Sequence, residues 1–288
     1  MTKLGIIGLG LMGGSLGLAL KREEARFNIL GYARRQQNRE VALRRGAVDS
    51  ATDDIGALVS ECNMLVCCLP VLLIPEFLAD CAPHMRPGTV ITDVGSTKLS
   101  IVERMREVVA GTDLHFVASH PICGSEKEGI ENAADDLYDG AVTVITPDGG
   151  EDPSAVAAVA DLWNSAGSKV VEMSPAEHDR CLARTSHLPH IAASLLASVV
   201  GRAEGADNIS SFCGSGFRGT SRLAEGSPKI WRDIIQTNSN PIVSEIRQYI
   251  STAEEFVGLI ERGDIDSVEK FLGECRSKRR SLVGDGDE

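Results

Sequence analysis

Short apolar segments of strand length alternate with stretches of helical periodicity from the N-terminus to about residue 172. Segments such as 64–69 (MLVCCL) lack polar residues at alternate positions, which is typical of strands covered on both faces. This alternation predicts βαβ crossovers and an α/β fold with a doubly wound, mainly parallel sheet. The predicted strands are 3–8, 28–32, 64–69, 89–94, 115–118, 142–146 and 169–173, and predicted helices include 13–21, 36–45, 74–81 and 99–109.

The pattern changes after residue 173, where strand-like segments end and helical periodicity continues. The segment 174–177 (SPAE) reads as a helix start, with serine as N-cap, proline in the first turn and glutamate three residues after the cap. Further helix starts are expected at Ser227-Pro228 and Asn240-Pro241, a last helix at 267–279 and a frayed tail at 284–288. We therefore expect a Rossmann domain at 1–172 and an all-α domain at 173–288.

Charge and composition limit the classes of partner. The chain has 288 residues, with 29 Lys+Arg against 41 Asp+Glu, and a net charge of -12 argues against nucleic acid or an anionic membrane as main partner. No apolar run approaches the roughly 20 residues that span a bilayer. The 8 cysteines include no CxxC pair, which favours reduced thiols in a cytoplasmic protein over a zinc or disulfide framework.

The strongest cofactor signal is the segment Gly8-Leu9-Gly10-Leu11-Met12-Gly13, a GxGxxG between the first predicted strand and helix. The first glycine permits a tight turn, the second lets a pyrophosphate approach the backbone, and the third allows close helix packing. Free N–H groups at the helix start would face the phosphates. Leu69 and Pro70, at the end of another predicted strand, are further candidates for this site. A Rossmann domain that has lost its cofactor is the alternative.

The choice of dinucleotide depends on the end of the second predicted strand. NAD enzymes carry an acid about 20 residues past the glycines, where it binds the ribose 2′-hydroxyl. Here the segment reads Ala33-Arg34-Arg35 and contains no acid. Two guanidinium groups could bind a 2′-phosphate, which favours NADP over NAD. The alternative is that both arginines simply open a solvated helix.

Two groups of polar residues stand out as candidate chemistry. His120 follows the predicted strand 115–118, and the carboxyl ends of such strands face the ligand crevice. Pro121 restrains the backbone that presents this imidazole. Ser96 follows another strand end and supplies a hydroxyl, although it could also cap the next helix. His84 and His115 are expected to be structural, and His178, beside Asp179, is expected to be exposed.

The second group is His187 and His190, which are three residues apart on one predicted helix, with Arg184 another three residues before. Pro189 removes a backbone hydrogen bond, so a kink is expected there. We interpret this face as part of a substrate pocket, with an interface or a satisfied core as the alternative. A metal site is disfavoured because no carboxylate or cysteine lies at ligand spacing.

Five motifs together resemble one family: 5–15 (GIIGLGLMGGS), 93–98 (DVGSTK), 119–129 (SHPICGSEKEG), 186–193 (SHLPHIAA) and 216–234 (GFRGTSRLAEGSPKIWRDI). Their order and content resemble the prephenate/arogenate dehydrogenase (TyrA) family of tyrosine biosynthesis. The motifs HPxxGxEKxG and SHLPH together are far more specific for this family than the glycine-rich motif, which many dinucleotide-binding proteins share. The resemblance implies a Rossmann domain followed by a helical dimerisation domain, hence a homodimer acting on a small molecule.

The resemblance also implies a reaction, the NAD(P)-dependent oxidative decarboxylation of prephenate to 4-hydroxyphenylpyruvate. By similarity, His120 accepts the hydroxyl proton and Ser96 hydrogen-bonds the hydroxyl or His120. Arg222 matches the arginine that pairs with a substrate carboxylate, and Arg218 and Arg232 are alternatives that could instead serve the dimer interface.

The remaining site residues come from the same resemblance. His190 and His187 would line the pocket near the substrate side chain, and Glu126 would gate or polarise the pocket entrance. Relative to the family, we expect no fused chorismate mutase and no appended regulatory domain, so tyrosine feedback would act at the active site itself.

Three alternatives remain open from the sequence. Arogenate dehydrogenase, or a dual-specificity cyclohexadienyl dehydrogenase, would yield tyrosine from a substrate that differs in one amino group, and motifs do not resolve that difference. A β-hydroxyacid dehydrogenase or imine reductase shares the architecture but gives no reason for the segment 119–129. A non-catalytic NADP sensor would bind the cofactor without turnover.

Overall fold

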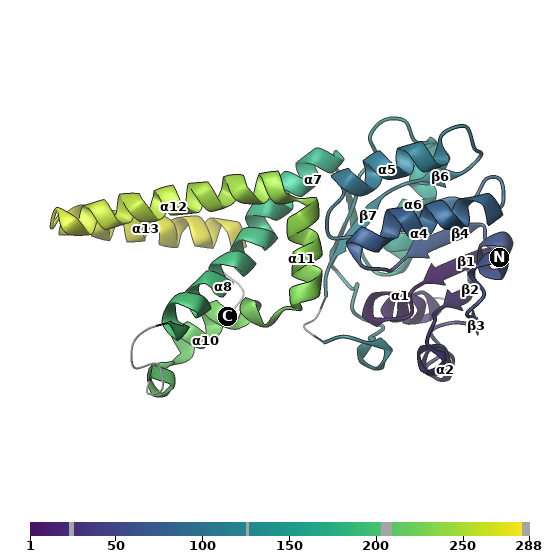
Figure 1. Cartoon of the computed structure of the whole chain (residues 1–288), viewed down its shortest axis with the longest axis horizontal. Coiled ribbons are helices and arrows are strands. Elements are labelled where there is room, and N and C mark those ends of the chain that lie inside the picture. Colours follow the sequence, from purple (N-terminus) through teal and green to yellow (C-terminus); the bar gives the residue numbers. More distant parts are fainter. Residues whose placement is uncertain (23–25, 125–126, 203–208, 284–288) are drawn as a thin grey trace. The chain divides into compact units, whose positions relative to one another are not determined.

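The computed structural model describes residues 1–22, 26–124, 127–202 and 209–283. It divides into two compact units, residues 1–239 and 240–288. The first unit is built on a six-stranded parallel sheet of order β3-β2-β1-β4-β5-β6 (Figure 1). Its strands are β1 Thr2–Ile7, β2 Phe27–Tyr32, β3 Ser50–Thr52, β4 Met64–Cys67, β5 Val90–Asp93 and β6 His115–Phe116. The predicted doubly wound fold is confirmed, with β3 as an additional short edge strand.

Helices cover both faces of this sheet, because successive strand residues are apolar on both sides. In β1, Leu4 and Ile6 pack into one core cluster, while Ile7 packs into the other. The first cluster includes side chains of α1 Leu11–Arg22, α2 Gln36–Arg44 and α6 Pro153–Ser165. The second includes side chains of α3 Ile55–Glu61, α4 Ile74–Cys81 and α5 Leu99–Val109, with short 3-10 turns η1 Val71–Leu73 and η2 Ala82–His84 around α4.

The chain leaves the parallel sheet after residue 118 and forms a second sheet of three strands. This sheet has the order β7-β8-β9, from β7 Ser119–Ile122, β8 Val142–Ile145 and β9 Lys169–Glu172, with the turn η3 Ile130–Asn132 after β7. β7 runs antiparallel to β8, and His120 lies within it, opposite Val144. His120 thus follows a strand of the parallel sheet, as expected, but its backbone stays extended and pairs with β8 in the second sheet.

Helices follow β9, and the described residues after it contain no strand. α7 Pro175–Leu182 begins as predicted: Ser174 accepts a bond from the backbone N–H of Glu177, whose side chain accepts from the backbone N–H of Ser174. A π-helical turn, η4 Ala183–His187, connects α7 to α8 Leu188–Gly201. Pro189 has no N–H for the regular bond to residue 185, which accounts for the predicted distortion. The first unit continues through η5 Ser210–Phe212, α10 Ser215–Ser221, η6 Arg222–Glu225 and α11 Pro228–Thr237.

The second unit is a helical hairpin of α12 Ser239–Glu261 and α13 Ile265–Val283. Phe256 and Phe271 join the two helices, with ring centroids 5.1 Å apart. Both helices begin close to their predicted starts, and the predicted tail 284–288 lies outside the described residues. None of the helices in the described ranges combines the length and the hydropathy that crossing a bilayer requires.

Candidate active site

One cavity of about 620 Å³ in the first unit brings together half of the sequence-predicted site residues. Its wall includes the glycine-rich turn, the ends of β4 and β5, the strand β7 and the turn between α7 and α8. The predicted residues that line it are Gly10, Leu11, Met12, Leu69, Pro70, Ser96, His120 and His187. Parallel strands end on the same side of a sheet, so the topology itself assembles this wall.

The glycine-rich turn has the geometry of a dinucleotide cradle. Gly8 has φ +103°, and a Cβ there would lie 2.6 Å from the carbonyl oxygen of Cys68. A Cβ on Gly10 would meet no atom within 4 Å, so the turn faces open space where a phosphate could approach. A Cβ on Gly13 would meet the carbonyl oxygen of Gly8 at 2.1 Å, so α1 packs directly against the turn. These residues fit the pyrophosphate of NAD(P), and Leu9 is buried behind them.

Asn38, a residue that no sequence motif points to, also fixes this turn. Its side-chain amide donates to the carbonyl of Leu9 at 3.1 Å, across 29 residues of sequence. Asn38 lies on α2, so the same helix that begins beside Arg34 and Arg35 holds the cofactor turn in place. An asparagine within a polar helix carries no sequence signal for such a contact.

Arg34 and Arg35 lie at the carboxyl end of β2, and both are exposed. Arg35 occupies the N-cap position of α2 and Arg34 directly precedes it, an arrangement compatible both with the expected 2′-phosphate contact and with a solvated helix start. Arg39 shapes this segment by donating to the carbonyls of Ala33 at 2.8 Å and Arg34 at 3.1 Å. It also pairs with Asp53 at 2.9 Å, so the nearby acid is engaged by a cation.

His120 is backed by a second imidazole. Its Nδ1 lies 2.8 Å from Nε2 of His178, and Nδ1 of His178 lies 2.8 Å from Oδ1 of Asp179. His178 is fully buried, so the expectation that it is exposed is wrong. The reason is that the first turn of α7 packs against the strand that carries His120. Asp179, the next residue, is buried together with His178.

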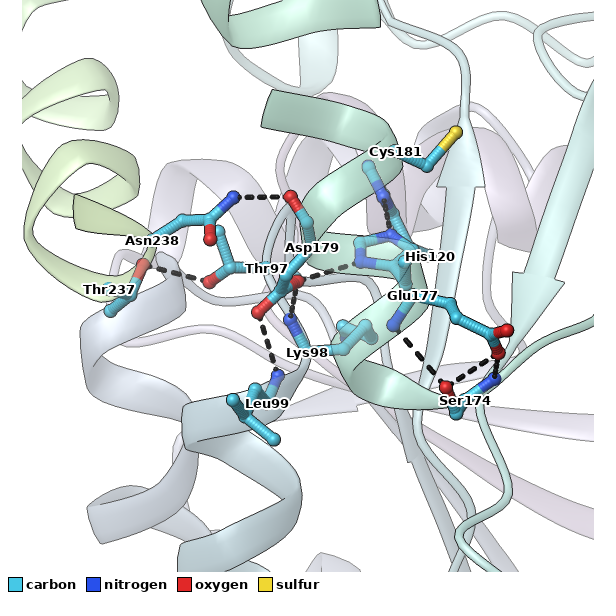
Figure 2. A network of polar contacts seen from close by, with 12 residues as sticks. Thr97, Lys98, Leu99, His120, Ser174, Glu177, Asp179, Cys181, Thr237 and Asn238 are labelled. Carbon is cyan, nitrogen blue, oxygen red and sulfur yellow. Dashed lines mark hydrogen bonds and ion pairs between the residues drawn. The ribbon is translucent and has the colours of Figure 1, made fainter. Parts of the chain in front are cut away.

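Asp179 also determines where α5 begins. Its carboxylate accepts backbone bonds from Lys98 at 2.7 Å and Leu99 at 3.0 Å, so a side chain from α7 caps the helix (Figure 2). The alternative role of Ser96 as the cap is therefore wrong, and its hydroxyl is left for the cavity that it lines. Asn238 donates to the carbonyl of Asp179 at 2.7 Å and joins α11 to the same network.

A buried ion pair lies beneath the site. Lys98 and Asp93 are both fully buried and form a short ion pair. Lys98 also donates to the carbonyl of Ser119 at 2.8 Å, and Asp93 accepts from the backbone N–H of Ser119 at 3.1 Å. The residue before His120 is thus held by both partners.

Burial dominates the titration of the histidines around the cavity. It lowers the pKa of His120 well below its usual value, and the neighbouring His178 and the Lys98 cation add to the effect. Burial likewise lowers the pKa of His178, opposed by the hydrogen bond to Asp179, and lowers the pKa of His187 to about 4. Each imidazole is therefore neutral at pH 7, and a neutral imidazole can accept a proton.

His187 lines the cavity, while His190 lies behind an aromatic wall residue, Trp231. The His190 and Trp231 rings stack with centroids 3.5 Å apart and planes at 11°. A Cβ on Gly226 would lie 2.7 Å from Nε1 of Trp231, so only glycine permits this approach. His190 is not among the described residues that line the cavity, whereas Trp231 is. Trp231 lies within the motif 216–234, but the sequence alone gives it no role.

The three arginines considered for substrate carboxylate binding are not among the described residues that line the cavity, in contrast to His120 and His187. Arg222 is exposed in η6, four residues before Gly226, and is not among the described lining residues. Arg218 donates to the carbonyl of Cys213 at 3.2 Å, and Arg232 pairs with Asp233 at 2.6 Å. Lys127 is the cation among the lining residues that the structure describes. Arg184 is exposed, and Glu126 lies outside the described residues.

Comparisons with known proteins add independent findings. Residues 16–172 match the family model "Prephenate dehydrogenase, nucleotide-binding domain", and residues 174–274 match "Prephenate dehydrogenase, dimerization domain". A prephenate dehydrogenase of Bacillus subtilis (strain 168) is 31% identical over 284 residues, which cover 96% of this chain and 75% of that protein. A cyclohexadienyl dehydrogenase of Zymomonas mobilis is 29% identical over 286 residues, 99% of this chain and 97% of that protein. The structure of a prephenate dehydrogenase from A. aeolicus, in complex with hydroxyphenyl propionate and NAD+, superposes with a TM-score of 0.91 at 29% identity over 98% of each chain.

Proposed function

The chain belongs to the prephenate dehydrogenase family, and on that premise we propose that it converts prephenate to 4-hydroxyphenylpyruvate by NAD(P)-dependent oxidative decarboxylation. The observation that carries the proposal is the convergence of Ser96 and His120 on one cavity with the glycine-rich turn 10–12. Arogenate, which carries an amino group in place of the keto group, is the alternative substrate.

In the proposed reaction, bound NAD(P)+ supplies the hydride acceptor. His120 accepts the proton of the substrate ring hydroxyl as the hydride leaves the carbon that bears it. Ser96 holds that hydroxyl by a hydrogen bond. Carbon dioxide then leaves from the opposite ring carbon, its bonding electrons make the ring aromatic, and the phenolic oxygen regains a proton from His120. Trp231 and His187 exclude water from the ring face.

We assign substrate carboxylate binding to Arg222, with Lys127 and Arg232 as alternatives. Arg222→Ala is expected to raise KM about 10- to 100-fold, with kcat within a few-fold of wild type, because a charged hydrogen bond is worth about 1.5–3 kcal/mol. Steady-state kinetics on purified protein measure this. An unchanged KM in Arg222→Ala, together with a raised KM in Lys127→Ala or Arg232→Ala, would transfer the role to that cation.

We propose that the preferred cofactor is NADP, bound through Arg34 and Arg35. In the double variant Arg34→Ala/Arg35→Ala, kcat/KM for NADP is expected to fall about 10- to 100-fold while the value for NAD changes little, because the 2′-phosphate loses charge-assisted bonds. Arg44→Ala, in the last turn of α2, is the matched control. A wild-type enzyme with a far higher kcat/KM for NAD than for NADP would contradict this assignment.

We further propose a homodimer formed through the helical part of the chain, with the domain boundary at 172/173. Support comes from the matched dimerization domain and from large apolar side chains left exposed on α8, α12 and α13, such as Val199 at 70%, Ile260 at 54% and Leu272 at 54%. Glu126 is proposed to act at the pocket entrance, and His190 to act through Trp231. Free thiols at all eight cysteines support a cytoplasmic location.

Initial rates over the four combinations of prephenate or arogenate with NAD or NADP test the function. Cofactor reduction followed at 340 nm with at least one combination is the expected result. Cofactor binding without reduction by either substrate would overturn the proposal in favour of a sensor.

A further inference from the structure

His178 is a buried titratable residue that the reaction described above does not use. It lies between the proposed base and a carboxylate, with 2.8 Å from its Nε2 to Nδ1 of His120 and 2.8 Å from its Nδ1 to Oδ1 of Asp179. A fully buried imidazole with both nitrogens hydrogen-bonded is held in one orientation. The direction of the two bonds can be derived from the remaining partners of Asp179.

Asp179 acts as an acceptor in this network. Its two oxygens accept the backbone N–H groups of Lys98 and Leu99, which can only donate. The bond from His178 to the same carboxylate therefore runs from Nδ1–H of His178, and Nε2 of that neutral ring carries the lone pair. That lone pair accepts Nδ1–H from His120, which leaves Nε2 of His120 without a proton.

We propose that His178 and Asp179 are positioning residues that hold His120 as the Nδ1–H tautomer, with its Nε2 lone pair presented to the substrate hydroxyl. The inference rests on the proposed function, since it concerns the same proton transfer. The proton moves from the substrate oxygen to Nε2 of His120, and no second transfer is needed. The imidazolium that forms keeps a hydrogen-bond acceptor at Nδ1, as the buried acid does for the histidine of a Ser-His-Asp triad.

The charges around His120 explain why protonated His120 needs a stabilising hydrogen-bond partner. Lys98, from the segment before α5, lies nearby and opposes protonation of His120, although Asp93 of β5 pairs with it. His187 of η4 acts on His120 in the same direction. His178 and Asp179 come from α7, and Asp179 is the carboxylate whose hydrogen bonds lead to His120. The two hydrogen bonds, from His120 to His178 and from His178 to Asp179, therefore stabilise the positive charge that forms on His120 during the reaction.

Two variants of His178 separate positioning from packing. In His178→Gln, the side-chain oxygen reaches the position of Nε2 and accepts from Nδ1–H of His120. In His178→Met, a side chain of similar length offers Nδ1–H of His120 only a weak thioether acceptor. We expect His178→Met to lower kcat about 100-fold with KM nearly unchanged, and to move the acidic limb of kcat to lower pH, because the imidazolium loses its acceptor. His178→Gln should retain kcat within about 10-fold, and Cys181→Ser, exposed on the same helix, should match wild type.

Equal kcat and equal pH profiles in wild type, His178→Gln and His178→Met would overturn the inference while leaving the function intact. A second measurement needs neither turnover nor a folded variant at position 178. Long-range ¹H–¹⁵N spectra of the wild-type protein with labelled histidine report each tautomer, and His120→Asn assigns the His120 signals. A protonated Nδ1 with bare Nε2 at His120 supports the inference, and the Nε2–H form overturns it. Absence of turnover in wild type would instead count against the proposed function.

Discussion

Replacing His120 with asparagine is expected to lower kcat by about 10²–10⁴-fold while KM stays within a few-fold of the wild-type value. Asparagine can occupy the position and hydrogen-bond the substrate hydroxyl, but it cannot take the proton as the hydride departs. Substrate binding depends on other groups, and so the loss falls on the chemical step. Steady-state rates of cofactor reduction, with both substrate and cofactor varied, measure the two constants separately.

His84→Asn is the matched control, because His84 is exposed in the 3-10 turn Ala82–His84 and is not among the described residues that line the cavity. The pH profile gives a second check on the same residue. Burial lowers the pKa of His120, so its proton-accepting form persists below pH 6.5, and kcat/KM of the wild type should fall only at still lower pH. Near-normal turnover in His120→Asn would remove His120 from the role of base.

The second large effect concerns stability. Lys98→Met is expected to lower the free energy of unfolding by about 3–5 kcal/mol, because it leaves the carboxylate of Asp93 buried without its cation. Lys98 also bonds the carbonyl of Ser119, so the same change loosens the strand that carries His120. Urea denaturation of wild type and variant gives the difference in the free energy of unfolding.

Two comparisons make this result specific to the buried pair. Lys3→Met removes a surface pair with Glu61, whose side chains are 45% and 53% exposed, and should cost no more than about 1 kcal/mol. The double variant Asp93→Asn/Lys98→Met should recover part of the stability lost in Lys98→Met, because no charge is left uncompensated. A stability of Lys98→Met equal to that of wild type would show that the pair does not hold this region together.

Features that depend on local chemistry could be predicted from the sequence. The turn at Gly8 requires a positive φ, which glycine adopts without strain, so the motif and its conformation go together. The capping box at Ser174 and Glu177 is likewise a contact between residues three apart. Strand positions followed from apolar runs covered on both faces, which the two core clusters explain.

Features that depend on contacts between distant segments could not be predicted. The contact between His120 and His178 joins residues 58 apart, and nothing beside His178 in the sequence shows that α7 packs there. The cap on α5 comes from Asp179, 80 residues from Leu99, so Ser96 was a reasonable local candidate. The change of sheet at Ser119 depends on pairing with β8, which lies beyond a long intervening segment.

A crystal structure of the enzyme with oxidised cofactor and the product 4-hydroxyphenylpyruvate tests most directly whether His120 is the group that faces the reacting hydroxyl. We predict the phenolic oxygen at about 2.6–3.2 Å from Nε2 of His120, with Ser96 as its second partner and the nicotinamide against the adjoining ring carbon. A product bound with its phenolic oxygen away from His120, or outside the cavity between the glycine-rich turn and Trp231, would contradict this account.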